Sequence, residues 1–364
     1  MKIEEIDSNF APKTIGGQEF MFVNVRSQPF SLEGFPVPSE EKFLRLPAEL
    51  EGKINDGAFW NGTHYTSGGA VRFRTDSPVI AIRAKLSDSG DPNHMPRAGS
   101  AGFDLYMDNG ANFHHMGTAQ PGREELDHDL ERVLTAVGPG EMRDWILNFP
   151  LYGGTTNVEL GFRPGSSIEK PTPHKIAKPV LFYGSSITQG GCASRPGNCY
   201  SSMLCRAVDA EQINLGFSGC GRGEAAMAEF IASLDLSAFV YDYDHNAPDP
   251  DHLRKTHEPF FRIIRAKHPV LPVIFMSKCN IWPELRNEAL EQGIERREII
   301  RTTFRNAVNA GDRNVYFIDG ETLFGKFCRT ACTVDRCHPN DLGFYRMYEH
   351  VLPVLKTALG LKKA

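Results

Sequence analysis

From about residue 178 onward, short apolar runs alternate along the chain with stretches of helical character. The first run, at 180–183, ends at Gly184. Runs of this kind are typical of strands that are buried on both faces of a sheet. Strands that alternate with helices predict a parallel sheet with helices on both faces. The further runs lie at 213–215, 239–241, 273–276 and 315–318, and the expected helices include 257–268, 295–309 and 342–359.

The first half of the chain has a different pattern. Residues 70–75 alternate apolar and polar side chains, and Ile80, Ile82 and Leu86 would share one face of the next run. Short runs of this type, separated by turn residues and with little helical periodicity, predict a β-sandwich. The charged stretch 122–133 is compatible with either a helix or an exposed ribbon.

The length of 364 residues fits two domains, each large enough to bury its own core. Residues 164–178 are rich in Pro, Ser and Lys and lack periodicity, which is typical of a linker. We therefore expect an N-terminal domain at 1–168, a linker at 169–178 and a C-terminal domain at 179–364.

Charge and hydropathy exclude some partners. The net charge is −5 and no basic block occurs, which argues against nucleic acid or an anionic membrane as the main partner. No apolar run of about 18 residues predicts a membrane helix. The acidic start at 1–7 does not resemble a signal peptide, so the expected location is cytoplasmic. The oligomeric state is left open.

The cysteines do not indicate a metal site. All eight lie between Cys192 and Cys337. Cys328, Cys332 and Cys337 precede His338 with spacings that differ from the Cys-x2-Cys pairs of zinc sites. We therefore expect buried or free thiols, without a metal or an organic cofactor.

Polar residues at the ends of the predicted strands suggest acyl transfer. Ser186 follows the first apolar run, Gly219 follows the second and Asn246 the third, and Asp335 and His338 stand just before the last helix. The carboxyl ends of parallel strands meet at one edge of the sheet, where ligands bind. Each residue alone has a simpler interpretation as a helix cap, a turn residue or a core histidine. Their joint order is hard to explain by chance.

These residue types are the ones that acyl transfer requires. A hydroxyl such as that of Ser186 becomes a nucleophile when a histidine, here His338, takes its proton. Asp335, three residues earlier, can orient the imidazole. Backbone N–H groups of Ser186 and Gly219 and the side-chain amide of Asn246 could hold the oxyanion. A helix that begins after Ser186 would add a partial positive charge.

The second half of the chain, at about 178–359, resembles the SGNH (GDSL-type) hydrolases. Their Ser, Gly, Asn and His blocks occur in this order, matching Ser186, Gly219, Asn246 and the Asp335-x-x-His338 block. The resemblance implies a flavodoxin-like three-layer α/β/α domain with a Ser-His-Asp triad and an oxyanion hole. Two positions depart from the pattern: Ser185 stands where the family has Asp, and 244–246 reads Asp-His-Asn instead of Gly-x-Asn-Asp.

Residues 102–106, Gly-Phe-Asp-Leu-Tyr, resemble the signature of a domain that precedes this SGNH subgroup. The resemblance implies a jelly-roll β-sandwich of the sort found in carbohydrate-active esterases. It also implies the function: a serine esterase that hydrolyses short O-acyl esters, with acetyl on a saccharide as the leading candidate. The alternatives are an acyltransferase that uses the same acyl-enzyme and an inactive carbohydrate-binding protein.

The tetrapeptide Gly-Ser-Ser-Ile occurs at both 165–168 and 184–187, so letter matching alone cannot choose the nucleophile. Ser186 follows an apolar run that can fix its backbone at a sheet edge. Ser167 lies in the Pro-, Ser- and Lys-rich stretch 164–178, which could not hold a nucleophile in place. The sequence therefore favours Ser186.

Overall fold

The computed structural model describes residues 2–5, 12–90, 92–110, 112–122, 129–135, 138–279 and 288–362. The chain divides into two compact units. The first, called here the β unit, comprises Met1–Arg45, His64–His174 and Ser194–Gly197. The second, called the α/β unit, comprises Leu46–Thr63, Lys175–Ala193 and Asn198–Ala364. The boundaries at 168 and 178 stay a prediction. The units are not continuous in sequence, because 46–63 belongs to the α/β unit and 194–197 to the β unit.

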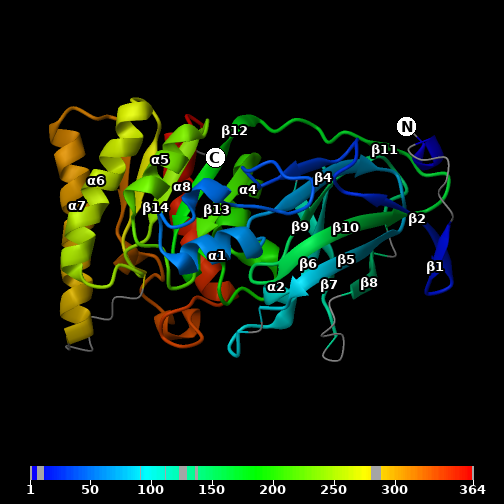
Figure 1. Ribbon diagram of the computed structural model, residues 1–364, viewed down its shortest axis with the longest axis horizontal. Coiled ribbons are helices and arrows are strands. Elements are labelled where there is room, and N and C mark those ends of the chain that lie inside the picture. The colour runs from blue at the N-terminus through cyan, green and yellow to red at the C-terminus, as the bar shows by residue number, and fades with distance from the viewer. Residues whose placement is uncertain are drawn as a thin grey trace. The chain divides into compact units, whose positions relative to one another are not determined.

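The α/β unit is built on a parallel sheet, as the sequence predicts (Figure 1). Its strand order, β13-β12-β14-β15-β16, is the 2-1-3-4-5 order of flavodoxin-like sheets. All five predicted apolar runs lie in these strands. They are β12 (Ile176–Gly184), β13 (Ala210–Gly216), β14 (Ala238–Asp242), β15 (Val273–Met276) and β16 (Val315–Ile318).

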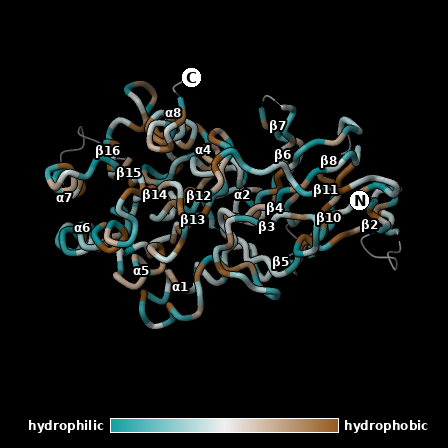
Figure 2. The backbone as a smooth tube through the Cα atoms, turned by 90° about the horizontal axis from the view of Figure 1, so that it is seen from above, coloured by the Kyte–Doolittle hydropathy of each residue, from teal (hydrophilic) through white to brown (hydrophobic). Residues whose placement is uncertain are grey.

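Helices cover both faces of this sheet. Figure 2 shows α4 and α8 on one side and α5 and α6 on the other. The three helices expected from periodicity correspond to α6, α7 and α8, apart from one residue at the ends of the first and the last. The helices of the unit are α1 (Asp56–His64, up to Thr63), α3 (Ser186–Gln189), α4 (Tyr200–Val208), α5 (Ala225–Ser233), α6 (Pro250–Lys267), α7 (Glu288–Asn309) and α8 (Asp341–Ala358).

The segment 46–63 belongs to the α/β unit although it lies early in the chain. Leu46, Leu50, Ile54 and Ala58 are buried in the same hydrophobic cluster as the strands β12 to β15. Burial of this apolar surface holds the segment there.

The β unit consists of antiparallel sheets around a common core. One sheet has the strand order β1-β2-β10-β5-β8 and the other β11-β4-β9-β6-β7, with β3 paired to β4. Ile82 and Leu160 from one sheet share a cluster with Phe73 and Trp145 from the other. The expected β-rich domain is therefore present, and its jelly-roll connectivity stays a prediction. The strands are β1 (Lys13–Ile15), β2 (Gln18–Asn24), β3 (Ser31–Glu33), β4 (Ala70–Thr75), β5 (Ile80–Asp88), β6 (Phe103–Asp108), β7 (Phe113–Ala119), β8 (Asp129–Thr135), β9 (Arg143–Asn148), β10 (Gly154–Phe162) and β11 (Ile168–Glu169), and a short helix, α2, spans Arg97–Ser100.

The charged stretch 122–133 is only partly described. Residues 129–133 lie in strand β8, whereas 123–128 lie outside the described residues. Among the described residues, no helix has the length and apolar character that a membrane crossing requires.

The stretch after residue 167 is not the mobile, solvated linker that its composition suggested. β11 pairs with β4. The backbone N–H and the hydroxyl of Thr172 both donate to the Asp144 carboxylate at 2.7 Å, and Arg72 donates to the Thr172 carbonyl at 2.7 Å. Proline-rich composition removes backbone donors, but it leaves carbonyls and side chains that can still bond. The segment is held to the β unit up to His174.

Candidate active site

Ser186 is the first residue of α3, just beyond the end of β12. The helix cap is Ser185, whose hydroxyl accepts the Ile187 N–H at 3.1 Å. Capping therefore falls to the neighbouring serine and leaves the Ser186 hydroxyl for another partner. α3 has only four residues and ends at Gly190, with φ +108°. It is too short to supply the partial positive charge that the sequence predicts at this position.

Ser186, His338 and Asp335 form a continuous hydrogen-bonded chain. The Ser186 Oγ lies 2.8 Å from His338 Nε2, and His338 Nδ1 lies 2.7 Å from Asp335 Oδ2. The structure thus brings together the three residues that the sequence placed in a triad. Ser186 is only 7% exposed, so this hydroxyl is largely shielded from bulk water.

The turn that carries Asp335 and His338 fixes the carboxylate on both oxygens. Asp335 Oδ1 accepts the backbone N–H groups of His338 at 2.7 Å and of Cys337 at 2.9 Å. Arg336 between them has φ +70°, a left-handed conformation that is strained for a residue other than glycine. Burial would raise the pKa of Asp335, but the hydrogen bonds from His338 and Cys337 outweigh it and lower this pKa to about 2. Asp335 is therefore ionised at neutral pH.

The residues after this turn attach it to α8. Asn340 accepts the Gly343 N–H at 3.1 Å as the cap of α8, and its own N–H donates to the Cys332 carbonyl at 2.9 Å. Cys332 is buried, and its Sγ accepts a hydrogen bond from Arg346 at 3.5 Å. Cys328, by contrast, is exposed.

The loop that contains Gly219 is a tight turn next to the end of β12. The Cys220 N–H donates to the Phe217 carbonyl at 3.0 Å, and the Phe217 N–H donates to the Gly184 carbonyl at 3.0 Å. Gly219 has φ +71°, and a Cβ there would meet nothing within 4 Å. The backbone conformation, rather than lack of space, therefore requires glycine. Among the described residues, the Gly219 N–H has no acceptor.

Asn246 is tied to this turn. Its Oδ1 accepts the Gly221 N–H at 3.2 Å, and its own N–H donates to the Tyr243 carbonyl at 3.1 Å. Within the described part of the chain its Nδ2 donates to no acceptor. Two N–H donors, one from Gly219 and one from Asn246, are therefore available for an anionic oxygen.

The sheet register explains why these loops meet. Gly184 at the end of β12 is paired with Gly216 of β13 and with Asp242 of β14. A Cβ on Gly184 would lie 2.2 Å from the Asp242 carbonyl, and one on Gly221 would lie 2.4 Å from the Gly184 carbonyl. Glycine at both positions lets the three strand ends approach closely.

Two buried carboxyl groups lie below this edge, and no sequence motif assigned them a role. Asp242 Oδ2 accepts hydrogen bonds from the Thr188 hydroxyl at 3.3 Å and the Tyr200 hydroxyl at 3.2 Å. Asp244 Oδ2 accepts the Lys278 N–H at 2.9 Å. Burial raises the pKa of Asp242 well above its usual range and that of Asp244 to about 6. Acidic residues directly after an apolar strand are the signal that could have identified them.

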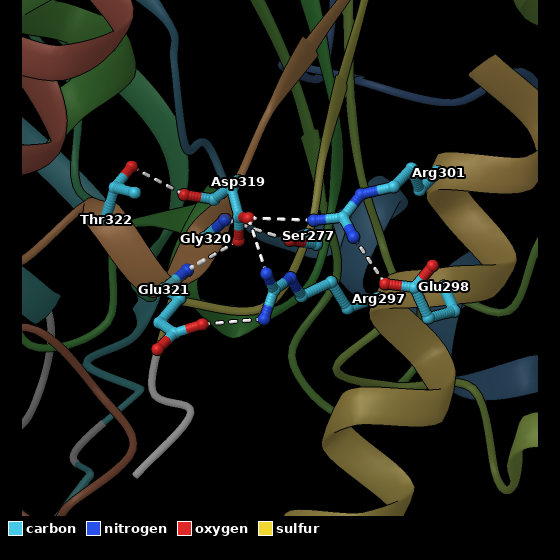
Figure 3. A network of polar contacts seen from close by, with 8 residues as sticks. All are labelled: Ser277, Arg297, Glu298, Arg301, Asp319, Gly320, Glu321 and Thr322. Atoms are coloured by element: carbon cyan, nitrogen blue, oxygen red, sulfur yellow. Dashed lines mark hydrogen bonds and ion pairs between the residues drawn. The ribbon is translucent and has the colours of Figure 1, made fainter. Parts of the chain in front are cut away.

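An ionic network holds the chain ahead of the Asp335 turn. Figure 3 shows Arg297 and Arg301 of α7 reaching the Asp319 carboxylate after β16. These contacts measure 2.9 Å and 3.0 Å, and Arg297 also binds Glu321 at 2.6 Å. The Gly320 N–H donates to the Ser277 hydroxyl at 2.9 Å. The ends of β15 and β16 are thus joined to each other and to α7.

The Gly-x-Asp-Leu-Tyr motif has a bonding role within the β unit. Asp104 is fully buried, and its carboxylate accepts hydrogen bonds from Asn148 at 2.8 Å, the Gly197 N–H at 2.9 Å and Arg195 at 3.1 Å. The Tyr106 hydroxyl accepts another hydrogen bond from Arg195. The motif therefore forms hydrogen bonds with the segment 194–197, which follows α3 in the sequence. The alternating strand pattern of the motif did not indicate this contact.

A flavodoxin-like parallel sheet that carries a hydrogen-bonded Ser, His and Asp at the carboxyl ends of its strands is the arrangement of a serine hydrolase. Residues 177–356 match the GDSL-like Lipase/Acylhydrolase family, and residues 20–168 match the N-terminus of Esterase_SGNH_hydro-type. The chain belongs to the GDSL-like, SGNH-type hydrolase family, and it is a carboxylic ester hydrolase.

Solved structures support this assignment. A GDSL-like lipase from Bacteroides ovatus ATCC 8483 is 30% identical, with a TM-score of 0.83 over 95% of this chain and 100% of that one. The salicylyl-acyltransferase SsfX3 from a tetracycline biosynthetic pathway is 21% identical, with a TM-score of 0.76 over 94% and 98%. The acetyl xylan esterase Est2A from Butyrivibrio proteoclasticus is 14% identical, with a TM-score of 0.56 over 93% and 99%. The last two are similar in fold. No curated protein matches the chain.

Proposed function

We propose that this protein is a serine esterase that hydrolyses short O-acyl esters, with acetyl on a carbohydrate as the first candidate. The observation that carries the proposal is the hydrogen-bonded chain from Ser186 through His338 to Asp335, at 2.8 Å and 2.7 Å. A serine hydroxyl bonded to an imidazole whose other nitrogen faces a carboxylate is ready for proton removal.

In the acylation step, Ser186 Oγ forms a bond to the ester carbonyl carbon while its proton passes to His338 Nε2. The carbonyl oxygen takes the electron pair and becomes an oxyanion. The Ser186 and Gly219 N–H groups and the Asn246 Nδ2 donate hydrogen bonds to it. The imidazolium then protonates the leaving alcohol oxygen as the C–O bond breaks, which leaves an acyl-enzyme.

In the deacylation step, water attacks the acyl carbon and gives a proton to His338. Collapse of the second tetrahedral intermediate releases the carboxylic acid and returns this proton to Ser186. Asp335 stays ionised throughout, because its pKa is lowered to about 2. It stabilises the imidazolium and holds the tautomer that has its proton on Nδ1.

The choice of a carbohydrate ester rests on the relatives. Similar structures include an acetyl xylan esterase and a family two carbohydrate esterase from Clostridium thermocellum in complex with cellohexaose. The Gly-x-Asp-Leu-Tyr region at 102–106 also lies in the part of the chain that matches the N-terminus of SGNH-type esterases. Short acyl groups and acetylated sugars are therefore the first substrates to test.

An acyltransferase is the second candidate. Its support is the similarity to the salicylyl-acyltransferase SsfX3, which extends over 94% of this chain. The same acyl-enzyme would pass its acyl group to an alcohol instead of water. Product analysis in the presence of acceptor alcohols separates the two reactions, because a transferase forms a new ester while a hydrolase releases free acid.

The test is hydrolysis of p-nitrophenyl acetate and of a panel of acyl chains and acetylated sugars by wild type and Ser186→Ala. We expect the variant to lose about four to six orders of magnitude in rate and to keep its fold. A fluorophosphonate should label Ser186 and leave Ser167 unmodified. Near-wild-type turnover by a clean preparation of Ser186→Ala, or a label on 165–168, would contradict the proposed mechanism.

A further inference from the structure

Two of the proposed oxyanion donors, those of Gly219 and Asn246, adjoin one peptide group, that between Cys220 and Gly221. Its N–H donates to Asn246 Oδ1 at 3.2 Å, and this bond fixes the orientation of the amide that carries Nδ2. The same residue, Cys220, closes the turn of Gly219 through its own N–H. If this peptide rotated, Asn246 would lose the bond that orients its amide, and the adjoining turn of Gly219 would be disturbed.

The carbonyl of the same peptide is held by a residue from the first part of the chain. Asn55 Nδ2 donates to the Cys220 carbonyl at 2.8 Å. Asn55 and Asn246 therefore bind the two polar atoms of one peptide group. A hydrogen bond to the carbonyl also polarises the N–H of that peptide, so the two bonds strengthen each other.

Asn55 is itself fixed in place. Its Nδ2 also donates to Glu224 Oε1 at 2.6 Å, and its backbone N–H donates to the same oxygen at 3.2 Å. Its Oδ1 accepts the Ala58 N–H at 2.9 Å at the start of α1. Glu224 is the residue at the N-terminal cap of α5. The side chain of Asn55 thus caps one helix and joins it to the start of another.

Packing against the turn is equally close. A Cβ on Gly57 would lie 2.4 Å from Cys220 Sγ and 3.6 Å from its Cβ. The first turn of α1 therefore lies directly on Cys220, and only glycine fits at this position without moving it. Buried Ile54 and Ala58 on either side hold the segment 46–63 in the core of the α/β unit.

We propose that Asn55 is a positioning residue for the oxyanion hole. It acts through the Cys220–Gly221 peptide on Gly219 and Asn246, and it does not touch the substrate. The segment 46–63 would thus complete the oxyanion hole from outside the part of the chain that carries the Ser, Gly, Asn and His blocks. The inference rests on the proposed function, because it assumes that Gly219 and Asn246 stabilise an oxyanion.

The first test replaces Asn55 by serine. Serine can still cap α1, but it is too short to reach the Cys220 carbonyl. Loss of one oxyanion donor costs about 10²–10³ in kcat, so misplacement should lower kcat roughly 10- to 100-fold with KM little changed. The inhibition constant of a trifluoromethyl ketone, which mimics the oxyanion, should rise by the same factor. The matched control is Asp56→Asn, an exposed change on the next residue, which should leave all three values unchanged.

A second test does not depend on Asn55. Gly57→Ala should push the Cys220 side chain and lower kcat, whereas Cys220→Ala removes the sulfur atom that the new methyl group meets. The double variant should then recover the kcat of Cys220→Ala alone, because the two Cβ atoms would be 3.6 Å apart. This recovery would not occur if Gly57→Ala acted only by destabilising α1. If Asn55→Ser does not fold, the pair still tests the step through which Asn55 is proposed to act, namely that displacement of Cys220 lowers kcat.

The outcomes separate the inference from the proposed function. A wild-type protein that hydrolyses esters and is labelled at Ser186, together with an Asn55→Ser variant of unchanged kcat and inhibitor affinity, overturns only the inference. A double variant that stays as slow as Gly57→Ala also overturns it. A wild-type protein that neither hydrolyses esters nor reacts with a fluorophosphonate overturns the proposed function and the inference with it.

Discussion

Burial of His257 should make the stability of the α/β unit depend on pH. The side chain comes from α6 and is 1% exposed. Its ring stacks on Tyr241 with a centroid distance of 4.5 Å, and its Nδ1 lies 2.8 Å from the Thr303 hydroxyl. Phe275 and Tyr243 complete the aromatic surroundings. Burial in this setting lowers the pKa of His257 from 6.5 to about 3.

Because the pKa of His257 is lowered in the folded protein, stability should decrease as the pH falls. In the unfolded chain His257 takes up a proton as the pH falls through about 6.5, while in the folded protein it stays neutral until about pH 3. Stability is therefore unaffected above the unfolded pKa and falls progressively between these two values. Between pH 7.5 and pH 5 the free energy of unfolding should fall by about 2 kcal/mol, because pH 5 lies about 1.5 units below the pKa of the unfolded chain.

The test compares wild type with His257→Phe, which keeps an aromatic ring in the stack and cannot ionise. The free energy of unfolding is measured by denaturant titration at pH 7.5 and pH 5. We expect the stability difference between the two proteins to move by about 2 kcal/mol in favour of the variant at the lower pH. Asp244 titrates in both proteins and cancels in this difference. A difference that is independent of pH would refute the argument.

Two further predictions concern the triad and the Gly-x-Asp-Leu-Tyr motif. Asp335→Asn should keep the fold and lower kcat by about 10⁴-fold at most, and His338→Ala should lower it further, as steady-state kinetics would show. The reverse ranking would mean that the base is misassigned. Asp104→Ala should destabilise the protein by about 3–5 kcal/mol, because it leaves Arg195 without its buried partner. Denaturant titration should give a smaller loss for Asn148→Ala, and equal losses would contradict this role of the Asp104 carboxylate.

The parallel sheet was predictable because its signals are local. Each strand is a short apolar run, and the polar residues that follow it are near it in the sequence. The Asp335–His338 contact was predictable for the same reason, since a three-residue spacing allows the carboxylate to reach the imidazole. Sheet order then brings Ser186 to this pair, which general rules for parallel sheets anticipate.

Contacts between distant parts of the chain could not be predicted in this way. The segment 46–63 belongs to the α/β unit because apolar side chains spaced by four residues are buried there, but Pro47 and Gly52 interrupt any helical pattern in the sequence. The Pro-rich stretch after residue 167 suggested mobility, yet Thr172 is bound by Asp144 from a strand far away in the sequence. Composition reports local preference and says nothing of such partners.

Ser185 shows how a departure from a family pattern can be understood physically. The residue is fully buried, and its hydroxyl caps α3 by accepting the Ile187 N–H. An aspartate could make the same bond, but it would add a charge at a buried site. Asp242 and Asp244 already lie buried at the neighbouring strand end, and burial raises the pKa of both. A third carboxylate there would be repelled by any charge on these two. The neutral Ser185 hydroxyl avoids that repulsion and still caps α3, so the Ser186 hydroxyl can bond to His338.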